Sequence, residues 1–449
     1  MFTKPSAKYK NFFLFFIFFI FFIATVNKQK LDFYNLQNAI VESLVEKKSW
    51  GIRGEGTSSW TFVNQQTNTP QLQYVGDVFY YDGLYFPAKS YGAHYWAAMI
   101  YSMLNFIGLS FHSNYYLVSF ILLGTSSILF ASIGLTLTYI VSKKITRNNA
   151  KAVFVTICLA FGSLLTGGIN IRNEESFGYW LIVIVYLLTF FNIKNRYFLF
   201  TTVLLAYYAV FSLPMATILL PYILYRLYRN IGNNFKLDFI LINILSISLI
   251  FLHNSLVFNR LIYSPYELAS KVNIGYKDSL LNLSNINFLN FINKLKFYFL
   301  DYKTSLIINY PLMVIAVAGI IISRLAKIEK FILLMTLMAF IFYITNIYDT
   351  GFIGYGTGRY ALGLFPFTYL YLSFILNKPS PIFFISTLIA SVISIYRGLF
   401  FLFSPVGDVH NLSNDQFVNL LFQRNFLLLM AIILVLIMLM SMQSKKSFA

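Results

Sequence analysis

The chain is organised around LDFYNLQNAIVESLVE (Leu31–Glu46) and YYDGLYFPAKSYGAHYW (Tyr80–Trp96), two pieces of its first polar stretch. This stretch follows an apolar segment, NFFLFFIFFIFFIATVN (Asn11–Asn27), and most of the chain after it is apolar. An acid (Asp32), several aromatic residues and a base (Lys89) therefore lie beside the first candidate membrane span. Ionisable groups next to a membrane are costly unless they are used, so this stretch is where function is expected.

The composition is that of an integral membrane protein. Of 449 residues, 58% are hydrophobic, 19% are aromatic and only 11% are charged, whereas soluble domains carry about 25% charged residues. Apolar runs of about 20 residues recur along the chain, as membrane-spanning helices require. We therefore expect an all-α polytopic fold with a single integral membrane domain, residues 1–449.

The formal net charge of +18 fits the same class of protein. More than half of the basic residues lie in short clusters between apolar runs, where they mark the cytoplasmic side of the membrane. Nucleic acid is therefore not an expected partner. The one cysteine, Cys158, lies inside an apolar run, which excludes an internal disulfide framework and a CxxC metal site.

Thirteen apolar runs are candidate spans: 11–27, 91–109, 116–141, 151–168, 176–192, 197–212, 213–228, 237–258, 305–322, 331–347, 361–377, 381–401 and 425–441. The first resembles the apolar part of a signal peptide, but no clear A-x-A cleavage pattern follows it, so we expect it to be retained. The basic clusters lie at Lys4/Lys8/Lys10, Lys143/Lys144/Arg147/Lys151, Lys194/Arg196, Arg226/Arg229/Lys236, Arg324/Lys327/Lys330, Lys378 and Lys445/Lys446.

Counted from a cytoplasmic N-terminus, all these clusters reach the cytoplasm only if one run between residues 28 and 142 does not cross. Run 91–109 contains His94, Asn105 and several Tyr and Trp residues. We expect it to lie as a juxtamembrane helix at the outer interface, where amphipathic aromatic residues are favoured. About twelve spans then remain, with both termini in the cytoplasm and the protein in the plasma (inner) membrane.

The same topology places five segments on the extracytoplasmic face: 28–115, 168–175, 259–304, 348–359 and 403–424. In the first loop, apolar residues recur at helical spacing over 33–44, with Asp32, Asn35, Asn38, Glu42 and Glu46 around the other side. This pattern predicts an amphipathic helix on the outer surface of the bundle. Residues 288–299, in the second long loop, show similar spacing and predict another surface helix.

Carboxylates are the first candidates for chemistry. Asp32 lies just beyond a span, where a low dielectric can raise a carboxyl pKa into the range of a general base; a helix N-cap explains the residue equally well. Glu174 and Glu175 share a short turn between two spans, where they are costly unless used or paired. Pairing with Arg172 is the alternative.

Two cations are candidate anion binders. Lys89 supplies a point charge and Arg359 a bidentate fork for phosphate. Arg359 follows four glycines in GFIGYGTGR (351–359), which let backbone N–H groups approach a ligand. There is no GK[ST] and no preceding strand, so this is not a P-loop. For either residue the alternative is a cation whose stem lies along the membrane interface.

No cofactor is indicated. The four histidines, His94, His112, His253 and His410, form no H-x₃-H pair, so a histidine metal site is not expected and a divalent metal is left open. No G-x-S-x-G motif supports hydrolase chemistry. The Tyr and Trp residues of 79–101 can stack on sugar rings, and an interfacial aromatic belt uses the same residues.

The order of these features resembles the GT-C superfamily of polyprenyl-phosphate-sugar-dependent glycosyltransferases. It is most similar to the protein O-mannosyltransferase-like branch (glycosyltransferase family 39-like), which includes the lipid A aminoarabinose transferase. The features that carry the resemblance are an acid after the first span, YYDGLYFPAKSYGAHYW, an acidic second outer turn, the pair His253-Asn254 and GTGRYALGLFPF (356–367). They extend over roughly residues 1–370.

The resemblance implies roles for individual residues. Asp32 falls on the family's catalytic acid, Lys89 on the lysine that contacts the donor phosphate, and Arg359 on the arginine of the later motif. Glu174 or Glu175 falls on the acid of the second outer loop. Tyr310-Pro311 falls where the family often has S-P. The expected substrate-binding residues are Asp82, Tyr85, Tyr91, His94, Asn254 and Tyr360. The sequence departs from the pattern at Phe33, where an acid is common, and at Ser90-Tyr91, where the family has x-Pro.

The resemblance further implies a hexosyltransferase that moves a sugar from a polyprenyl (dolichyl or undecaprenyl) phosphate to an acceptor glycan, lipid or protein, with inversion, outside the cytoplasm. Its partners would be that lipid-linked sugar, the acceptor and membrane lipids, as in glycosylation of the cell envelope. A multi-span transporter or flippase is a competing class, although no inverted repeat is visible. A polysaccharide polymerase or ligase is another, although loop 403–424 has one arginine.

Overall fold

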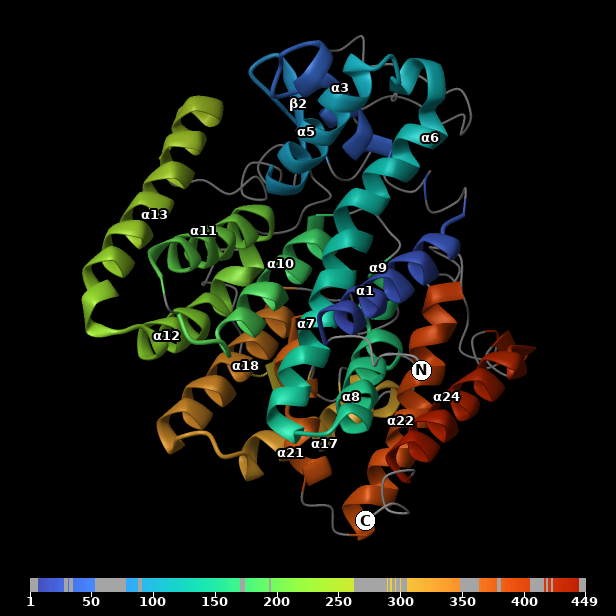
Figure 1. Ribbon diagram of the computed structural model, residues 1–449. Helices are drawn as coiled ribbons and strands as arrows, with labels where there is room; N and C mark the ends of the chain where they lie inside the picture. The colour runs from blue at the N-terminus through green and yellow to red at the C-terminus, as the bar shows by residue number, and fades with distance from the viewer. Residues whose placement is uncertain are drawn as a thin grey trace.

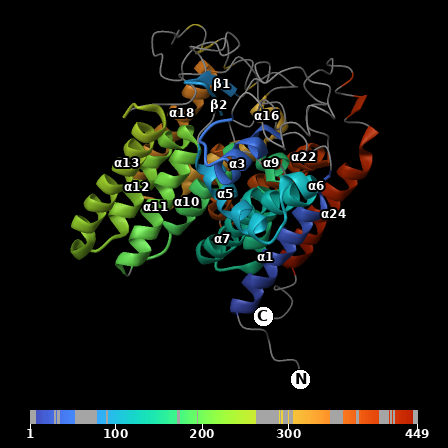
Figure 2. The same ribbon diagram turned by 90° about the horizontal axis from the view of Figure 1, so that it is seen from above.

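The computed structural model describes residues 7–27, 31, 35–52, 78–87, 91–169, 174–193, 195–261, 289, 291–292, 295, 299, 305–347, 363–377, 381–403, 416, 419–420 and 423–443. These residues form a helical bundle that carries a small β-hairpin at one end (Figures 1 and 2). The elements, in chain order, are α1 (Ala7–Ala24), α3 (Asn35–Glu46), β1 (Val78–Tyr81), β2 (Leu84–Pro87), α5 (Gly92–Phe106), α6 (Phe111–Leu123), η2 (Gly124–Ile128), α7 (Leu129–Thr146), α8 (Asn149–Phe161), α9 (Leu165–Ile169), α10 (Glu174–Leu188), α11 (Arg196–Ser212), η3 (Pro214–Ile218), α12 (Leu220–Asn230), η4 (Asn233–Phe235), α13 (Lys236–Phe258), α16 (Leu306–Asn309), α17 (Leu312–Ile322), α18 (Lys327–Ile347), α20 (Leu364–Tyr369), α21 (Leu372–Asn377), α22 (Pro381–Phe403) and α24 (Asn425–Gln443).

Three helices are long and apolar enough to cross a membrane. They are Phe111–Thr146, Asn233–Phe258 and Pro381–Phe403, with 36, 26 and 23 residues. At about 1.5 Å per residue, each exceeds a hydrocarbon core of about 30 Å. Leu245, Leu249 and Leu252 of α13 are exposed, as the side chains of a lipid-facing helix are. The protein is therefore an integral membrane protein, and the count of twelve spans stays a prediction.

Several expected spans are not continuous α-helices: the runs 151–168, 213–228, 305–322 and 361–377 each divide into two elements. The run 213–228 divides into the 3₁₀ turn η3 and the 11-residue helix α12. Pro214 and Pro221 lie in the first turns of these two elements, where a missing backbone N–H is tolerated and where a continuing helix would be broken. The run 91–109 becomes α5, with 15 residues, a length of about 22 Å that falls short of the hydrocarbon core.

The described chain is predominantly helical, as expected, and the hairpin is a local departure from the all-α expectation. Strands β1 and β2 pair antiparallel, with Tyr80 opposite Tyr85 and Tyr81 opposite Leu84. Asp82 and Gly83 between them have φ values of +47° and +80°, as a type I′ turn requires, and an Asp-Gly pair is a preferred sequence for that turn. Ile52 adds a bridge to Tyr85, with both N–H···O distances at 2.8 Å.

Basic clusters from several helices meet at one end of the bundle, the lower end in Figure 1. Arg196, at the start of α11, pairs with Asp238, at the start of α13, at 2.7 Å. Arg229 of α12 pairs with Glu329 of α18 at 2.5 Å, and Arg226 also bonds this glutamate. α11 and α13 therefore run parallel, and the start of α18 lies at the same end. The clusters gather as the positive-inside argument requires; which side of the membrane they face stays a prediction.

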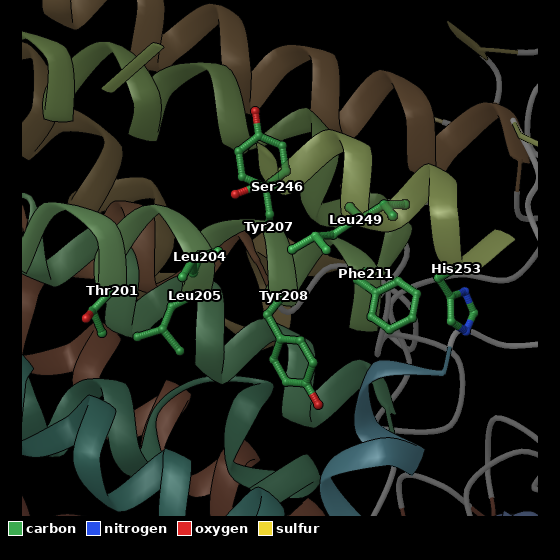
Figure 3. Close-up of a pocket in the computed structure, with 10 residues that line it drawn as sticks. Thr201, Leu204, Leu205, Tyr207, Tyr208, Phe211, Ser246, Leu249 and His253 are labelled. Carbon is green, nitrogen blue, oxygen red and sulfur yellow. The ribbon is translucent and has the colours of Figure 1, made fainter. Parts of the chain in front are cut away.

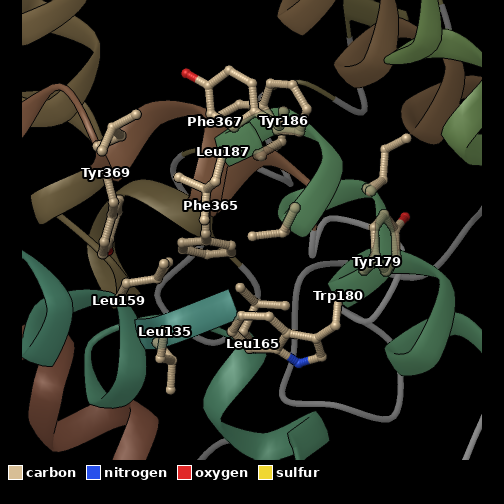
Figure 4. Packing of buried hydrophobic residues seen from close by; sticks show 14 of the residues in the cluster. Leu135, Leu159, Leu165, Tyr179, Trp180, Tyr186, Leu187, Phe365, Phe367 and Tyr369 are labelled. Atoms are coloured by element: carbon tan, nitrogen blue, oxygen red, sulfur yellow. The ribbon is translucent and has the colours of Figure 1, made fainter. Parts of the chain in front are cut away.

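Aromatic rings fill the centre of the bundle (Figure 4). Tyr186 of α10 stacks on Phe367 of α20 with ring centroids 4.2 Å apart. Trp180 is fully buried and lies against Gly134 of α7, where a Cβ would come within 2.6 Å of the indole. A glycine there lets α7 and α10 approach closely.

Candidate functional site

The candidate site lies at the end of the bundle opposite the basic clusters, where α5 meets α11 and α13 (Figure 1). The Tyr208 hydroxyl of α11 donates to the Gly92 carbonyl at 2.6 Å. A Cβ on Gly92 would overlap the Ser212 side chain and lie 2.8 Å from its Cα. The glycine therefore fixes how closely the first-loop helix docks on the C-terminal end of α11.

Four aromatic side chains converge at this junction. Tyr91, which is 1% exposed, has its ring centroid 5.5 Å from that of Tyr95 and 5.6 Å from that of His253. Phe211 packs edge-on against His253 at 4.7 Å. The Tyr91 hydroxyl donates to the Trp50 carbonyl, which ties the cluster to the segment after α3. We refer to Tyr91, Tyr95, Phe211 and His253 as the aromatic cluster.

A chain of hydrogen bonds fixes the state of the histidine. The Asn254 amide nitrogen donates to the Leu261 carbonyl, which turns the amide oxygen toward His253 Nδ1 at 3.3 Å. An amide oxygen only accepts, so Nδ1 carries the proton. His253 Nε2 then accepts from the Tyr95 hydroxyl at 2.8 Å. Burial raises the pKa of Tyr95 above its ordinary value, so this hydroxyl remains a proton donor at neutral pH.

A groove of about 460 Å³ runs from the aromatic cluster along α11 and α13, and its wall includes the exposed side chains of Leu204 and Leu249 (Figure 3). Most of its wall is aliphatic or aromatic, and its polar groups are hydroxyls and the imidazole. The lining residues are Thr201, Leu204, Leu205, Tyr207, Tyr208, Phe211, Ser246, Leu249, Ile250 and His253. Phe211, Tyr208 and His253 lie at the end nearest α5 (Figure 3). The groove is thus mainly apolar, and its imidazole lies at the end nearest α5.

Helix α3 is placed differently from the expectation. The helix forms where the amphipathic pattern predicts it, but every residue from Gln37 to Ser43 is buried, so the expectation that α3 rests on the outer surface of the bundle is wrong. The polar face is covered because it bonds to α6: the Asn38 amide donates to the Tyr115 hydroxyl at 3.0 Å and to Ser119 Oγ at 2.9 Å. Figure 2 shows α3 over α5 and beside α6.

Two acids of α3 are part of this packing. Glu42 is 1% exposed, and Glu46 accepts from the Tyr101 hydroxyl of α5. That hydroxyl also accepts from the backbone N–H of Phe111 at 3.1 Å. Burial, followed by the bond to Glu46, raises the pKa of Tyr101. These bonds hold α5 between α3 and α6. The two acids therefore help to position the helix that carries the aromatic cluster.

The structure brings three of the expected site residues together and places the others apart. Tyr91, His94 and Asn254 lie in or beside the aromatic cluster; the ring centroids of His94 and Tyr91 are 5.9 Å apart. Asp82 and Tyr85 lie in the hairpin, where Asp82 is exposed in the turn. Glu174 and Glu175 begin helix α10. The expectations for Asp32, Lys89, Arg359 and Tyr360 fall outside the described residues, as does most of the expected helix 288–299.

Sequence reasoning missed Tyr208 and Phe211. It included Tyr95 only among the Tyr and Trp residues of 79–101 that can stack on sugar rings, and it named His253 in the pair with Asn254 and among the histidines that form no metal site. The sequence signal for His253 was the polar pair His253-Asn254 at the end of an apolar run. Tyr208 and Phe211 gave no sequence signal, because aromatic residues are common in any membrane span. Within the described part of the chain, no group of three or more His, Cys, Asp or Glu side chains could hold a metal ion.

No family model and no curated protein matches this chain. A crystal structure of ArnT from Cupriavidus metallidurans bound to undecaprenyl phosphate aligns with 97% of this chain and 76% of its own, at 10% identity and a TM-score of 0.42. Two chains at this TM-score need not share a fold. Fold and site together define a polytopic integral membrane protein with a largely apolar groove that ends at a hydrogen-bonded aromatic cluster.

Proposed function

We propose that the protein is a GT-C-type membrane glycosyltransferase, which moves a sugar from a polyprenyl phosphate to an acceptor at the end of the bundle that carries the first loop. Donor and acceptor would meet near the aromatic cluster. This end is opposite the basic clusters, so it would face away from the cytoplasm.

The groove between α11 and α13 is the observation that carries the proposal. A lipid-linked sugar has a long apolar chain and a polar head at the membrane interface. In the groove, aliphatic side chains predominate along α11 and α13, and Tyr208 and His253, with the Tyr95 hydroxyl behind the histidine, lie at the end nearest α5. Thr201, Tyr207 and Ser246 add hydroxyls elsewhere along the wall. A water-soluble substrate would gain little from a wall that is apolar over most of its length.

The proposed chemistry assigns a task to each candidate. Asp32 removes the proton of the acceptor hydroxyl. The acceptor oxygen then attacks the anomeric carbon as the bond from that carbon to the phosphate oxygen breaks, so the configuration inverts and polyprenyl phosphate leaves. Lys89 and Arg359 stabilise the phosphate charge, and Glu174 or Glu175 orients the sugar or the acceptor. No nucleotide site is needed, because the donor sugar arrives on lipid.

Asp32→Asn tests the proposal. Radiolabelled polyprenyl-phosphate sugars are supplied to membranes that contain the protein, and label is followed into the acceptor fraction. We expect transfer by the wild type and a loss of about 10²–10⁴-fold in rate for Asp32→Asn, as for other general bases. Asp238→Asn, the same change at the opposite end of the bundle, should leave the rate unchanged.

Two results would contradict the assignment in different ways. No transfer by the wild type from any such donor would refute the glycosyltransferase class. Transfer with a fully active Asp32→Asn protein would keep the class and show that Asp32 is a helix cap, because Asn caps as well as Asp; the base would then be sought at Glu174 or Glu175.

A further inference from the structure

A second cavity, of about 400 Å³, lies at the basic end, far from the aromatic cluster. Three helix C-termini surround it: those of α7 at Thr146, α17 at Ile322 and α21 at Asn377. Three cations line it, Lys144, Arg147 and Arg324, together with the apolar side chains of Ile322 and Phe374. We call it the basic hollow.

The cations of the basic hollow have no carboxylate partner in the described part of the chain. The ion pairs there are Arg196–Asp238, Arg226–Glu329 and Arg229–Glu329. Lys144 donates to the Phe190 carbonyl at 2.7 Å, and Lys144, Arg147 and Arg324 are exposed. Their charge is therefore available to an anion.

Cations near helix C-termini have an ordinary explanation, since they complement the helix dipole. Each helix end carries about half a negative charge, so three ends offset about 1.5 of the three positive charges. Positive charge therefore remains in excess of what the three helix ends offset. The positive-inside rule accounts for cations at this end, but it does not require a hollow between three helices.

Arg147 adopts a backbone conformation that arginine rarely takes. It caps α7 with φ +53° and ψ +23°, the left-handed conformation in which Gly or Asn is favoured. An arginine there places a guanidinium at the rim of the hollow against the intrinsic preference of the position. Its planar fork, like that of Arg324, suits the paired oxygens of a phosphate.

We propose that the basic hollow binds the phosphate of an anionic phospholipid head group. It lies at the end of membrane helices, at the level of lipid head groups, and its wall combines cations with Ile322 and Phe374, which can contact the glycerol and first methylene groups. Basic pockets between membrane helices are suited to this class of ligand. A free phosphate would use the same cations but not the apolar part of the wall.

Lipid binding by the purified protein in neutral detergent tests the proposal. Phosphatidylglycerol and phosphatidylcholine are added separately as mixed micelles, and bound lipid is counted by native mass spectrometry of the intact protein. The double variant Arg147→Asn/Arg324→Gln removes two charges and keeps a residue suited to the left-handed position. Lys236→Gln is the matched control, because Lys236 begins α13 at the same end and does not line the hollow.

We expect phosphatidylglycerol to be preferred over phosphatidylcholine, and its affinity to fall about fivefold for each cation removed, or about 25-fold in the double variant. Lys236→Gln should change it less than twofold, and excess inorganic phosphate should not displace the lipid. Equal binding of both lipids, displacement by inorganic phosphate, or equal weakening by Lys236→Gln would each overturn the proposal. If the double variant does not fold, single Arg324→Gln should still show the fivefold loss.

Discussion

At the scale of single residues, the site depends on side chains whose hydrogen bonds fix where their protons lie. His253 is such a group, because the Asn254 amide fixes its Nδ1 proton and Tyr95 occupies its Nε2. The pair joins residues 158 positions apart and links the first-loop helix to a membrane span. If it lies at the head of a lipid groove, its loss should alter substrate use more than stability.

A double-mutant cycle over Tyr95→Phe and His253→Asn measures this. One hydrogen bond contributes about 0.5–1.5 kcal/mol. If this bond holds the groove end in its binding-competent form, losing it lowers the population of that form, so each single variant should raise the donor KM by about fivefold. The double variant should be little worse than either single variant, because the partners act as one unit. Thermal unfolding in detergent is the second measurement. Additive KM effects, or a lowered unfolding midpoint with unchanged KM, would mean that the pair only supports the fold.

Gly92 makes a second residue-scale prediction. A Cβ there would overlap Ser212, so Gly92→Ala should destabilise the α5–α11 contact by about 1–3 kcal/mol, the usual cost of overpacking. The unfolding midpoint should fall, and transfer activity with it. Gly232→Ala is the control, since nothing lies within 4 Å of a Cβ at that position; it should be neutral. Equal behaviour of the two variants would show that α5 docks loosely.

At the scale of helices, buried ion pairs at the basic end hold neighbouring elements together. Arg226 and Glu329 have side chains only 8% and 7% exposed, and they join α12 to α18. Arg226 also lies over the Phe190 ring at 4.0 Å and donates to Thr189 Oγ1 at 2.9 Å. A charge that is taken out of water in this way needs its partner.

Glu329→Gln should therefore be strongly destabilising. Removing one partner of a buried pair leaves an uncompensated charge and typically costs about 3–5 kcal/mol. Asp238→Asn removes a pair whose arginine is 64% exposed, so its effect should stay below about 1 kcal/mol. Unfolding midpoints of both variants in the same detergent give the comparison. A silent Glu329→Gln would mean that solvent reaches Arg226.

At the scale of the whole molecule, the two ends of the bundle differ in charge and in contents. The basic hollow and the buried ion pairs lie at one end, and the aromatic cluster and the hairpin lie at the other (Figure 1). If the membrane crosses between them, the two ends face different compartments.

Cysteine labelling tests that arrangement. The natural Cys158 is buried, so it contributes little background. Lys327→Cys, at the basic end, should react with a membrane-impermeant maleimide only after the membrane is opened, and Asp82→Cys, in the exposed hairpin turn, should react in intact cells. The physical reason is that basic loops are retained in the cytoplasm. Labelling of both positions from the same side would contradict the topology.

The sequence by itself determined the class of protein and the gathering of several basic clusters at one end of it. Long apolar runs and scarce charge mark membrane helices, and the basic clusters predicted the common end at which they meet. Asp82-Gly83 was a local signal for the hairpin that the all-α expectation overlooked. These signals are readable because hydropathy, charge and turn preference depend on residues close together in the chain.

Only the tertiary structure decided that α3 is buried on its polar face, that Tyr95 meets His253, and that α11 and α13 run parallel around a groove. Tyr91, His94 and Asn254 were expected in the site, but no spacing in the sequence brings them to one place. Each of these features is a contact between distant residues. Its energy depends on which helix faces pack together, and a helical period shows that a face is apolar or polar without showing what will cover it.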